Sequence, residues 1–428
     1  MASQLYDDFS KHELLQTETL DGVLSYFYTV ASGGVLGQFM PLVNVDADKV
    51  KMDIDKAQGG GMTPSVPQGS ESPIYEAPAG RGSKEWTPAE FREKVKVMES
   101  ELIDLRQLGT LGDLMGARQV LQKKYRQIEI RLANRLEWMR RQVLFDKSVS
   151  YAVAGTNYVE TIAYAHPSYL DVTAGVLWDN ASADPLDDLQ TWAYDYELAT
   201  GFQIERVIVP AGTMNILTSN TRFREIATAN FGVFQGTPAE VNALLTKFLG
   251  VGMVEESRHR INFLTECSAD AAAAQAVVNL ADAAELEAGD IVWLRSMSTE
   301  VSEQGEVLSV AGNAVTLTAN LTNPFVAGDP VRYHKMIIPD NKCLIIGKPM
   351  SPMDPLHQES LSSEYLNQFA DVASTYSRFS TLEPKSGMFT KFRDFIDIGD
   401  PPHVEQILGI RALPRVHYQD GWMTATIK

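Results

Sequence analysis

The stretch from Gln58 to Gly82 constrains the fold most, because its composition rules out a helix. Three glycines stand together at 59–61, and prolines follow at 64, 67, 73 and 78. Proline lacks an amide hydrogen and glycine favours irregular backbone, so the stretch is predicted to be an extended loop. Before it, Val50, Met52 and Ile54 alternate with charged residues, which is the period of a strand with one wet face. A long hairpin is favoured over a linker or a disordered insert.

A helix is predicted to start at Thr87-Pro88-Ala89-Glu90, where the Thr hydroxyl and Glu90 complete a capping box around a first-turn proline. Apolar residues then recur at helical spacing from Phe91 to Leu105, and again from Val120 to Val143. We predict a long amphipathic helix that needs a partner surface along its length. Its interleaved basic residues are interpreted as a solvated face or an intersubunit salt-bridge row, with phosphate binding as the alternative: Lys123, Lys124, Arg126, Arg131, Arg135, Arg140 and Arg141.

Strands and helices mix after residue 150. Strands are predicted at 151–153, 161–164, 207–209 and 261–264, and helices at 211–227 and 237–248. Asp184-Pro185 and Thr237-Pro238-Ala239-Glu240 are typical helix starts. Later, 335–338 and 343–346 are predicted to form a hairpin around Pro339-Asp340-Asn341. The last strands, 404–427, are expected to break at Pro414 and at Asp420-Gly421.

Residues 268–335 differ in composition from the rest of the chain and are predicted to form a small inserted β domain. Glycine, alanine, valine and threonine dominate, and 305–310 meets 315–318 across Ala311-Gly312-Asn313, which favours a hairpin. The only two cysteines, Cys267 and Cys343, stand near its borders. They are interpreted as buried reduced thiols by default, with a disulfide between paired strands as the alternative.

The composition excludes some classes of protein. With 428 residues the chain is long enough for two or three domains. A net charge of −18 argues against a nucleic-acid reader, since phosphate binding requires lysine and arginine. Two cysteines give no disulfide framework and suit a reducing cytosol. The uncharged stretch from Gly22 to Met40 is diluted by glycines and follows acidic residues, so we interpret it as a buried or interface segment and expect no membrane span.

We predict no catalytic, cofactor-binding or metal-binding residue. Gly347-Lys348-Pro349 lacks the hydroxyl of a phosphate loop, and His166 and His259 have no zinc-binding spacing. Asp187-Asp188 and Glu255-Glu256 are adjacent in sequence and are interpreted as helix-start or surface charge. An enzyme would have to assemble its site from scattered residues.

Several blocks, in order, resemble the major capsid protein of lambda-type tailed bacteriophages. The blocks are Phe39-Met40-Pro41-Leu42-Val43 with Asp48-Lys49-Val50, residues 134–151, Asp184-Pro185-Leu186-Asp187-Asp188-Leu189, Ile208-Val209-Pro210, Ile338-Pro339-Asp340-Asn341, Asp397-Ile398-Gly399-Asp400-Pro401-Pro402 and Leu413-Pro414-Arg415-Val416. Their order and spacing carry the resemblance, which covers most of the chain except the insert. It implies an α+β, Hong Kong 97-type phage capsid fold with no enzymatic activity.

The resemblance also implies a set of domains along the chain. It implies an N-terminal arm at 1–43, an extended E-loop hairpin at 44–86 and a peripheral domain with a spine helix at 87–190. An axial domain at 191–395 would contain the inserted β domain at 268–335, and C-terminal strands at 396–428 would return to the peripheral domain. No Lys–Asn crosslink is predicted, although Lys51, Lys56 and Lys84 lie in or near the hairpin.

By the same resemblance, the chain would self-assemble into pentamers and hexamers of an icosahedral shell around a double-stranded DNA genome. Its implied partners are a scaffolding protein, a portal, a decoration or cement protein, and packaged DNA by non-specific proximity only. Assembly would take place in the host cytoplasm, and the virion capsid would be the final location. Two alternatives stay open: the shell protein of an encapsulin-like nanocompartment, and an acidic cytosolic enzyme.

Overall fold

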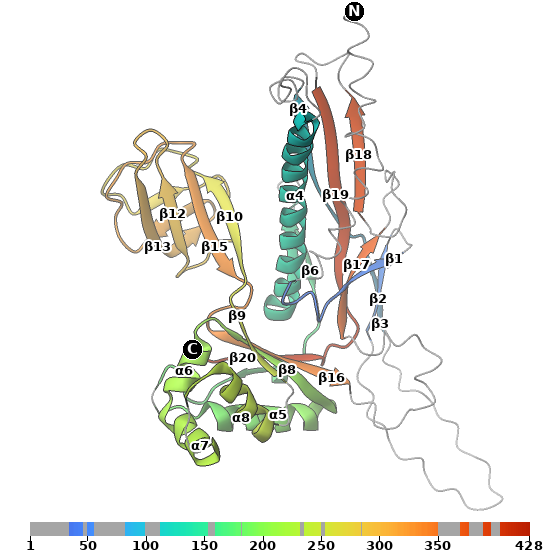
Figure 1. Cartoon of the computed structure of the whole chain (residues 1–428), viewed down its shortest axis with the longest axis vertical. Coiled ribbons are helices and arrows are strands. Elements are labelled where there is room, and N and C mark those ends of the chain that lie inside the picture. The colour runs from blue at the N-terminus through green and yellow to red at the C-terminus, as the bar shows by residue number, and fades with distance from the viewer. Residues whose placement is uncertain are drawn as a thin grey trace, which may run out of the picture. The chain divides into compact units, whose positions relative to one another are not determined.

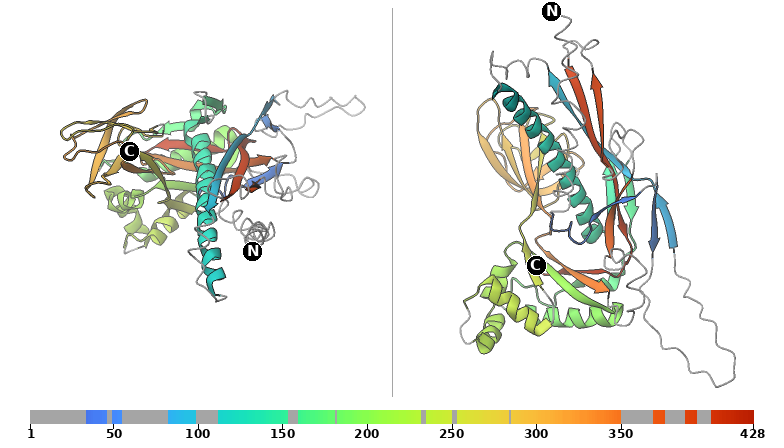
Figure 2. Two further views of the ribbon diagram at one scale, coloured as in Figure 1. Left: turned by 90° about the horizontal axis from the view of Figure 1, so that it is seen from above. Right: turned by 45° about the vertical axis from the view of Figure 1, so that its right-hand side comes forward.

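The protein is described by a computed structural model that divides into two compact units. Unit 1 comprises Met1–Glu256 and Asn341–Lys428, and unit 2 comprises Ser257–Asp340. The described residues are 34–45, 49–54, 82–98, 112–152, 159–180, 182–231, 235–249, 253–283, 285–349, 369–375, 388–394 and 403–428. Unit 1 contains helices and sheets, and the described part of unit 2 contains a sheet, so the protein is of the mixed α+β class (Figures 1 and 2). No helix in this described part is long and apolar enough to cross a membrane.

The first sheet of unit 1 is built around one long strand. This strand, β19 (His403–Val416), pairs antiparallel with three others: β4 (Ala89–Met98), β18 (Met388–Asp394) and β17 (Ala370–Thr375). Strand β1 (Leu42–Val45) extends the sheet by pairing parallel to β17. The 30-residue helix α4 (Gly112–Arg141) runs beside β4 and β19 (Figure 1). The later part of the predicted long helix, from Val120 onward, is thus confirmed, and its partner surface is this sheet.

The helix expected to start at Thr87 is wrong, because residues 89–98 form strand β4. Their burial alternates, with Ala89 and Val95 buried while Arg92, Lys94 and Lys96 are exposed. The alternating face turns to α4, where Arg131 forms an ion pair with Glu93 and the Arg135 guanidinium lies over the Phe91 ring. Ten residues of pairing with β19 outweigh the local capping signal, since tertiary context overrides propensity.

Pro414 does not break the last strand, contrary to expectation. It lies opposite Val372 in the pairing of β19 with β17. The Val372 amide donates to the Pro41 carbonyl on the other side, so Val372 and Pro414 form a pair without mutual hydrogen bonds. The Pro414 nitrogen therefore points away from β17, and pairing with β4 has already ended at Ala412. A proline is tolerated there because no ladder donor is lost.

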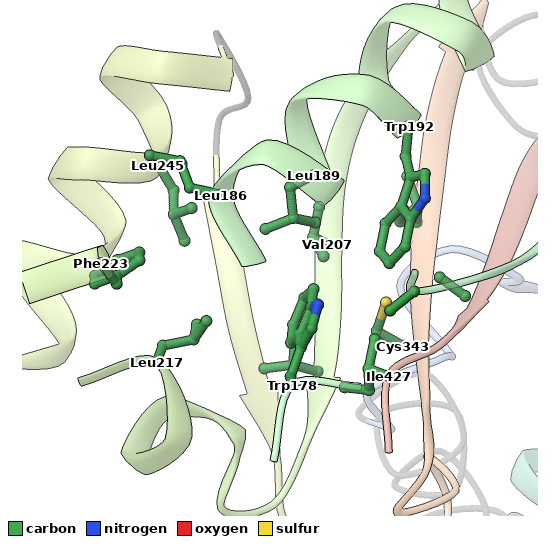
Figure 3. Packing of buried hydrophobic residues seen from close by; sticks show 14 of the residues in the cluster. Trp178, Leu186, Leu189, Trp192, Val207, Leu217, Phe223, Leu245, Cys343 and Ile427 are labelled. Atoms are coloured by element: carbon green, nitrogen blue, oxygen red, sulfur yellow. The ribbon is translucent and has the colours of Figure 1, made fainter. Parts of the chain in front are cut away.

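The second sheet of unit 1 carries a helical layer. Its strand order is β7 (Asp171–Thr173), β20 (Trp422–Thr426), β16 (Lys342–Pro349), β8 (Phe202–Pro210) and β9 (Met253–Ser257). The helices are α5 (Pro185–Thr200), α6 (Thr213–Ser219), α7 (Thr221–Phe231) and α8 (Pro238–Leu249). Trp178, Trp192, Phe223 and Cys343 belong to one buried cluster between these layers (Figure 3). The Trp178 and Trp192 rings stack with centroids 6.0 Å apart.

The helix starts in this layer follow from their capping residues. The Asp184 side chain accepts from the Asp187 amide ahead of Pro185. Thr237 and Glu240 exchange the two hydrogen bonds of a capping box, which confirms that prediction. The helix predicted over 211–227 is instead two helices, because Asn220 is extended and its side chain accepts from the Phe223 amide to begin α7.

Unit 1 also contains two separate strand pairs. Strand β2 (Val50–Ile54) pairs with β3 (Gly82–Trp86), and β5 (Ser148–Ala152) pairs with β6 (Val159–Ala163). The predicted strands near 151 and 161 are confirmed. A π-helical turn (Gln142–Asp146) follows α4, with a short 3-10 turn at Ser168–Leu170. Residues 55–81, including most of the predicted loop, lie outside the described residues.

Unit 2 is a β unit with its own core. Its six strands follow the order β10 (Arg260–Glu266), β15 (Pro330–Met336), β12 (Ile291–Arg295), β13 (Ser302–Ala311), β14 (Ala314–Leu317) and β11 (Val277–Asn279). Strands β13 and β14 form the predicted hairpin, which turns at Gly312 with a φ of 61°. The core includes Leu294, Phe325 and Val331. The unit is wider than the insert expected at 268–335.

Two expectations about the borders of unit 2 are corrected. Residues 335–338 and 343–346 do not form a hairpin, because β15 pairs inside unit 2 whereas β16 pairs with β8 and β20 in unit 1. For the same reason the cysteines do not face each other. Both are free and buried, with Cys267 in the unit 2 core and Cys343 in that of unit 1. Reduced thiols, the default interpretation, are confirmed.

The strands also distribute differently from the expected boundaries. Strands β17 and β18 fall within 191–395, which was expected to form one axial domain, yet they pair with β19 in the first sheet. Strand β20 falls within 396–428, which was expected to return to the peripheral domain, yet it pairs with β16 and β7 in the second sheet. Each sheet therefore draws strands from both ends of unit 1.

Candidate assembly sites

The end of the N-terminal segment is fastened to α4 by a buried ion pair. Arg140 and Glu137 lie one helical turn apart, with Nη1 and Oε2 2.9 Å apart and only 0% and 2% of each residue exposed. The other Glu137 oxygen accepts from the Leu36 amide at 2.8 Å. Arg140 Nε donates to the Met40 carbonyl oxygen at 2.9 Å. Burial lowers the pKa of Arg140, and the Glu137 charge opposes that change.

The same segment has no room for a larger residue at its start. A β-carbon on Gly34 would lie 2.5 Å from the Glu137 carboxylate. Leu36 and Met40 are fully buried. On the outer side, Arg206 of β8 donates to the Gln38 side chain and its guanidinium lies over the Phe39 ring. Residues 34–40 are therefore a fixed anchor, hereafter the arm anchor, which confirms part of Gly22–Met40 as a buried segment.

The basic residues of the long helix do not form one solvated face. Lys123, Arg126 and Arg131 are exposed, but Arg140 and Arg141 are buried. The interpretation of Arg140 and Arg141 as part of that face is therefore wrong. Sequence reasoning missed the Glu137–Arg140 pair, and its one visible signal was the opposite charges three residues apart inside an apolar run.

A second buried carboxylate joins two adjacent strands of the first sheet, β17 and β19. Asp371 of β17 accepts from Arg415 through both of its oxygens, at 2.9 and 2.6 Å, and lies 2.9 Å from His417 Nε2. Burial by itself would raise the pKa of Asp371, but the hydrogen bonds and charges of His417 and Arg415 hold that pKa below its ordinary value. This fork-like pairing fixes the register of β17 against the C-terminal strand.

A polar pocket lies where the turn that follows α4 meets the second sheet. It has a volume of about 370 Å³, and its lining is Phe145, Asp146, Lys147, Asp171, Val172, Thr173, Lys342, Thr424 and Thr426. Lys147 Nζ lies 2.8 Å from Asp171, which also accepts from the Thr424 hydroxyl. Burial lowers the pKa of Lys147, and Asp171 opposes that change.

His166 lies beside this pocket and is held neutral. Its side chain is 1% exposed, stacks on Trp422 at 4.5 Å, and lies 3.1 Å from the Gln419 carbonyl oxygen through Nδ1. Burial and the Lys147 charge lower its pKa to about 4. Lys147 forms an ion pair with Asp171 of β7 and donates to Thr424 of β20, so the group attaches β7 and β20 to the turn that follows α4.

The histidines and adjacent carboxylate pairs noted in the sequence are dispersed. His166 and His259 lie in different units, and Asp187 and Asp188 stand in the first turn of α5, as expected for helix-start charge. Asp188 accepts from the Trp178 indole, and Glu256 accepts from the Gly212 amide. Among the described residues no group of three or more His, Cys, Asp or Glu could hold a metal ion.

Helix α5 presents an apolar pair to solvent. Tyr194 and Leu198 lie four residues apart, hence on one face, and are 67% and 73% exposed. Large apolar residues on one exposed helix face are typical of a protein contact surface.

Comparison with known proteins gives one family. The model of the family described as phage major capsid protein E matches residues 34–252, just over half of the chain. That match starts at the arm anchor and ends before unit 2. Among curated protein sequences, none matches this chain significantly.

Several solved structures are similar at low identity. A phage-related protein from Bordetella bronchiseptica RB50 is 10% identical with a TM-score of 0.47, covering 94% of this chain and 96% of that one. A putative capsid protein of an Escherichia coli CFT073 prophage is 12% identical with a TM-score of 0.46, covering 97% and 99%. A virus-like particle protein from Pyrococcus furiosus is 10% identical with a TM-score of 0.37, covering 96% and 100%. Since these TM-scores lie below 0.5, the family assignment rests on the sequence match.

Proposed function

The chain belongs to the phage major capsid protein E family, and from this premise we propose how it builds a shell. As a major capsid protein it forms the icosahedral head shell of a phage and is located in the virion capsid. The observation that carries this function is the family match over residues 34–252. What remains to be proposed is which parts of the chain make the shell and with which partners.

The proposed architecture is the Hong Kong 97-type capsid fold. The 30-residue helix α4 beside a long β19 suits the spine of a peripheral domain. The second sheet with α5–α8 suits an axial domain, which we place at 168–256 with 341–349 and 422–426 on the strength of strand pairing. Residues 87–152, 369–394 and 403–416 then form the peripheral domain. Unit 2 is the inserted domain.

The proposed reaching elements are the arm at 1–43 and the E-loop at 44–86. The arm anchor supports the proposed arm. Because residues 34–40 are held in place by hydrogen bonds, the preceding residues can extend from a fixed point onto a neighbouring subunit. The β2–β3 ribbon supports the second, since it pairs the two ends of the 44–86 segment. Its exposed Lys51–Glu85 ion pair, at 3.2 Å, contributes little to stability.

The proposed partners follow from the shell. Copies associate as pentamers and hexamers, with a scaffolding protein, a portal and a decoration or cement protein as further partners, in the host cytoplasm. Contact with packaged double-stranded DNA is non-specific, which suits a chain of charge −18. The chain itself performs no catalysis in this proposal.

The experiment is negative-stain electron microscopy with light scattering on the purified chain, alone and co-expressed with a scaffolding protein. Closed shells, or rings of five and six, are expected. A matched variant lacking residues 1–33 keeps the arm anchor and is expected to stay folded yet to lose closed shells. A persistent monomer or dimer with scaffold present would overturn the assembly proposal. Purified shells filled with host proteins instead of DNA would point to the nanocompartment alternative.

A further inference from the structure

Unit 2 carries opposite charge on the two sides of its sheet. Along β15 the side chains alternate, so Arg332 is exposed while Tyr333 and Lys335 are 3% and 5% exposed and turn to the core side. The unit is acidic as a whole, with five lysines and arginines against eleven aspartates and glutamates. The distribution of these charges, rather than their sum, distinguishes the two sides.

The outer side is a basic face with an apolar centre. The register places Trp293 and Leu264 opposite Arg332, and Leu264 is 69% exposed. The His334 ring stacks on Trp293 with centroids 4.9 Å apart. By alternation, Arg260 and Arg295 point to this same side, and both are exposed. We name Arg260, Arg295 and Arg332 with Trp293 and Leu264 the basic face.

The three arginines of the basic face lack a partner within the described residues, where no ion pair involves any of them. Two carboxylates share that side but stand away from its centre: Glu266 lies opposite Pro330, and Glu306 lies opposite Ile291. Unpaired guanidinium groups around exposed apolar side chains are typical of a surface that meets a protein with acidic groups, since arginine and aromatic residues are enriched in contacts.

The core side is bordered by an acidic segment. Asp282, Glu285, Glu287 and Asp290 lie within nine residues, and Glu287 and Asp290 contact Lys335 Nζ at 3.1 and 3.4 Å. Burial raises the pKa of the Tyr333 hydroxyl, and the charges of Asp282, Glu285 and Asp290 raise it further. The Lys335 contacts place Glu287 and Asp290 on the core side, opposite the basic face. The Asp282 amide donates to the Thr265 hydroxyl, which by strand alternation lies on the same core side.

We infer that the basic face of one copy docks against the acidic segment 282–290 of a second copy, head to tail. Such a heterologous contact closes when copies are arranged in a ring, and complementary charges fix its register. This inference rests on the proposed shell, which supplies neighbouring copies. A second copy suits the face better than a polyanion does, because Glu266 and Glu306 on the same side would repel a continuous negative charge.

The test is a charge swap in the full chain. R295E/R332E reverses the basic face, D282R/E285R reverses the acidic segment, and a fourfold variant combines them. The critical concentration for shell assembly is measured by light scattering at 0.15 M salt, where charges act over about 8 Å. Either reversal is expected to raise it by about tenfold, and the fourfold variant to return it close to wild type. Independent, additive defects in the fourfold variant would overturn the inference.

Controls separate this inference from the proposed function and from misfolding. E300K reverses a charge in the β12–β13 turn that belongs to neither named surface, and it is expected to assemble like wild type. Assembly of E300K with no effect of either reversal would leave the shell intact and overturn the docking. R295Q/R332Q, which only neutralises, should act in the same direction but more weakly. If R295E/R332E shells form normally but lose retention on a heparin column, the face binds polyanions and the inference fails.

Discussion

Arg140 and Met40 are joined across 100 residues of chain by one hydrogen bond, from the guanidinium Nε to the carbonyl oxygen, 2.9 Å long. The same guanidinium is paired with Glu137, whose other oxygen receives the Leu36 amide. The carboxylate, the guanidinium and two backbone groups thus hydrogen-bond to one another in a buried site. The structure of the arm anchor depends on this set being complete.

Removing Arg140 alone is expected to be severely destabilising. R140M keeps the apolar volume but leaves Glu137 charged and 2% exposed, which costs about 3–5 kcal/mol for a broken buried pair. The measurement is urea unfolding of the dissociated subunit, followed by tryptophan fluorescence. E137Q/R140M removes both charges and should be less destabilised than R140M. Equal losses in the two variants would contradict the ion pair as the cause, and K123M on exposed α4 surface serves as a neutral control.

Gly34→Ala is expected to release the arm anchor while leaving the rest of unit 1 folded. Its β-carbon would lie 2.5 Å from a carboxylate that Arg140 and Leu36 hold in place, so the segment must move instead. We expect new protease cleavage near residue 36 and a loss of closed shells. Gly175→Ala is the matched control, because nothing lies within 4 Å of its added β-carbon. Wild-type protease resistance of Gly34→Ala would contradict this account.

His166 makes stability depend on pH in a definite window. Its pKa is about 4 in the folded chain against an ordinary 6.5, so between these values the unfolded state binds more protons and stability rises with pH. The contribution of neutral His166 to the free energy of unfolding is therefore complete above pH 6.5. It is lost as the pH drops towards 4, by up to about 3 kcal/mol. H166Q should flatten this slope between pH 4.5 and 6.5, measured by thermal unfolding. An unchanged slope in H166Q would assign it to other groups.

Structural elements were predicted correctly where the residues that determine them lie close together in sequence, and wrongly where those residues lie far apart. Asp184 and Thr237 were predicted as helix starts because their capping partners lie within three residues. The strand at 89–98 was predicted as a helix because its partner, β19, lies more than 300 residues away. Pro414 was predicted to break a strand because only the pairing of Val372 with Pro41 shows that its missing amide is not needed.

The candidate sites were less predictable than the fold. The resemblance implied an extended arm near the N-terminus. No sequence pattern identified Glu137 and Arg140 as the residues that hold the end of this arm. A basic residue in a helix is usually solvated, and burial of Arg140 requires both a carboxylate and a carbonyl from another segment. The basic face of unit 2 depends on strand register, since Arg332 and Trp293 are far apart in sequence yet lie opposite each other.

The two cysteines are expected to report separately on the two units. Burial raises the pKa of Cys267 to about 11 and that of Cys343 to about 12, so neither thiol reacts at pH 7.5 until its core opens. Because the cores are separate, C343A and C267A each leave one reporter, for unit 2 and unit 1 respectively. Labelling by a maleimide in increasing urea should give two different midpoints, since independent cores open with their own free energies. One shared midpoint would mean that both units unfold as a single cooperative body, and fast labelling without urea would contradict the burial of the thiol concerned.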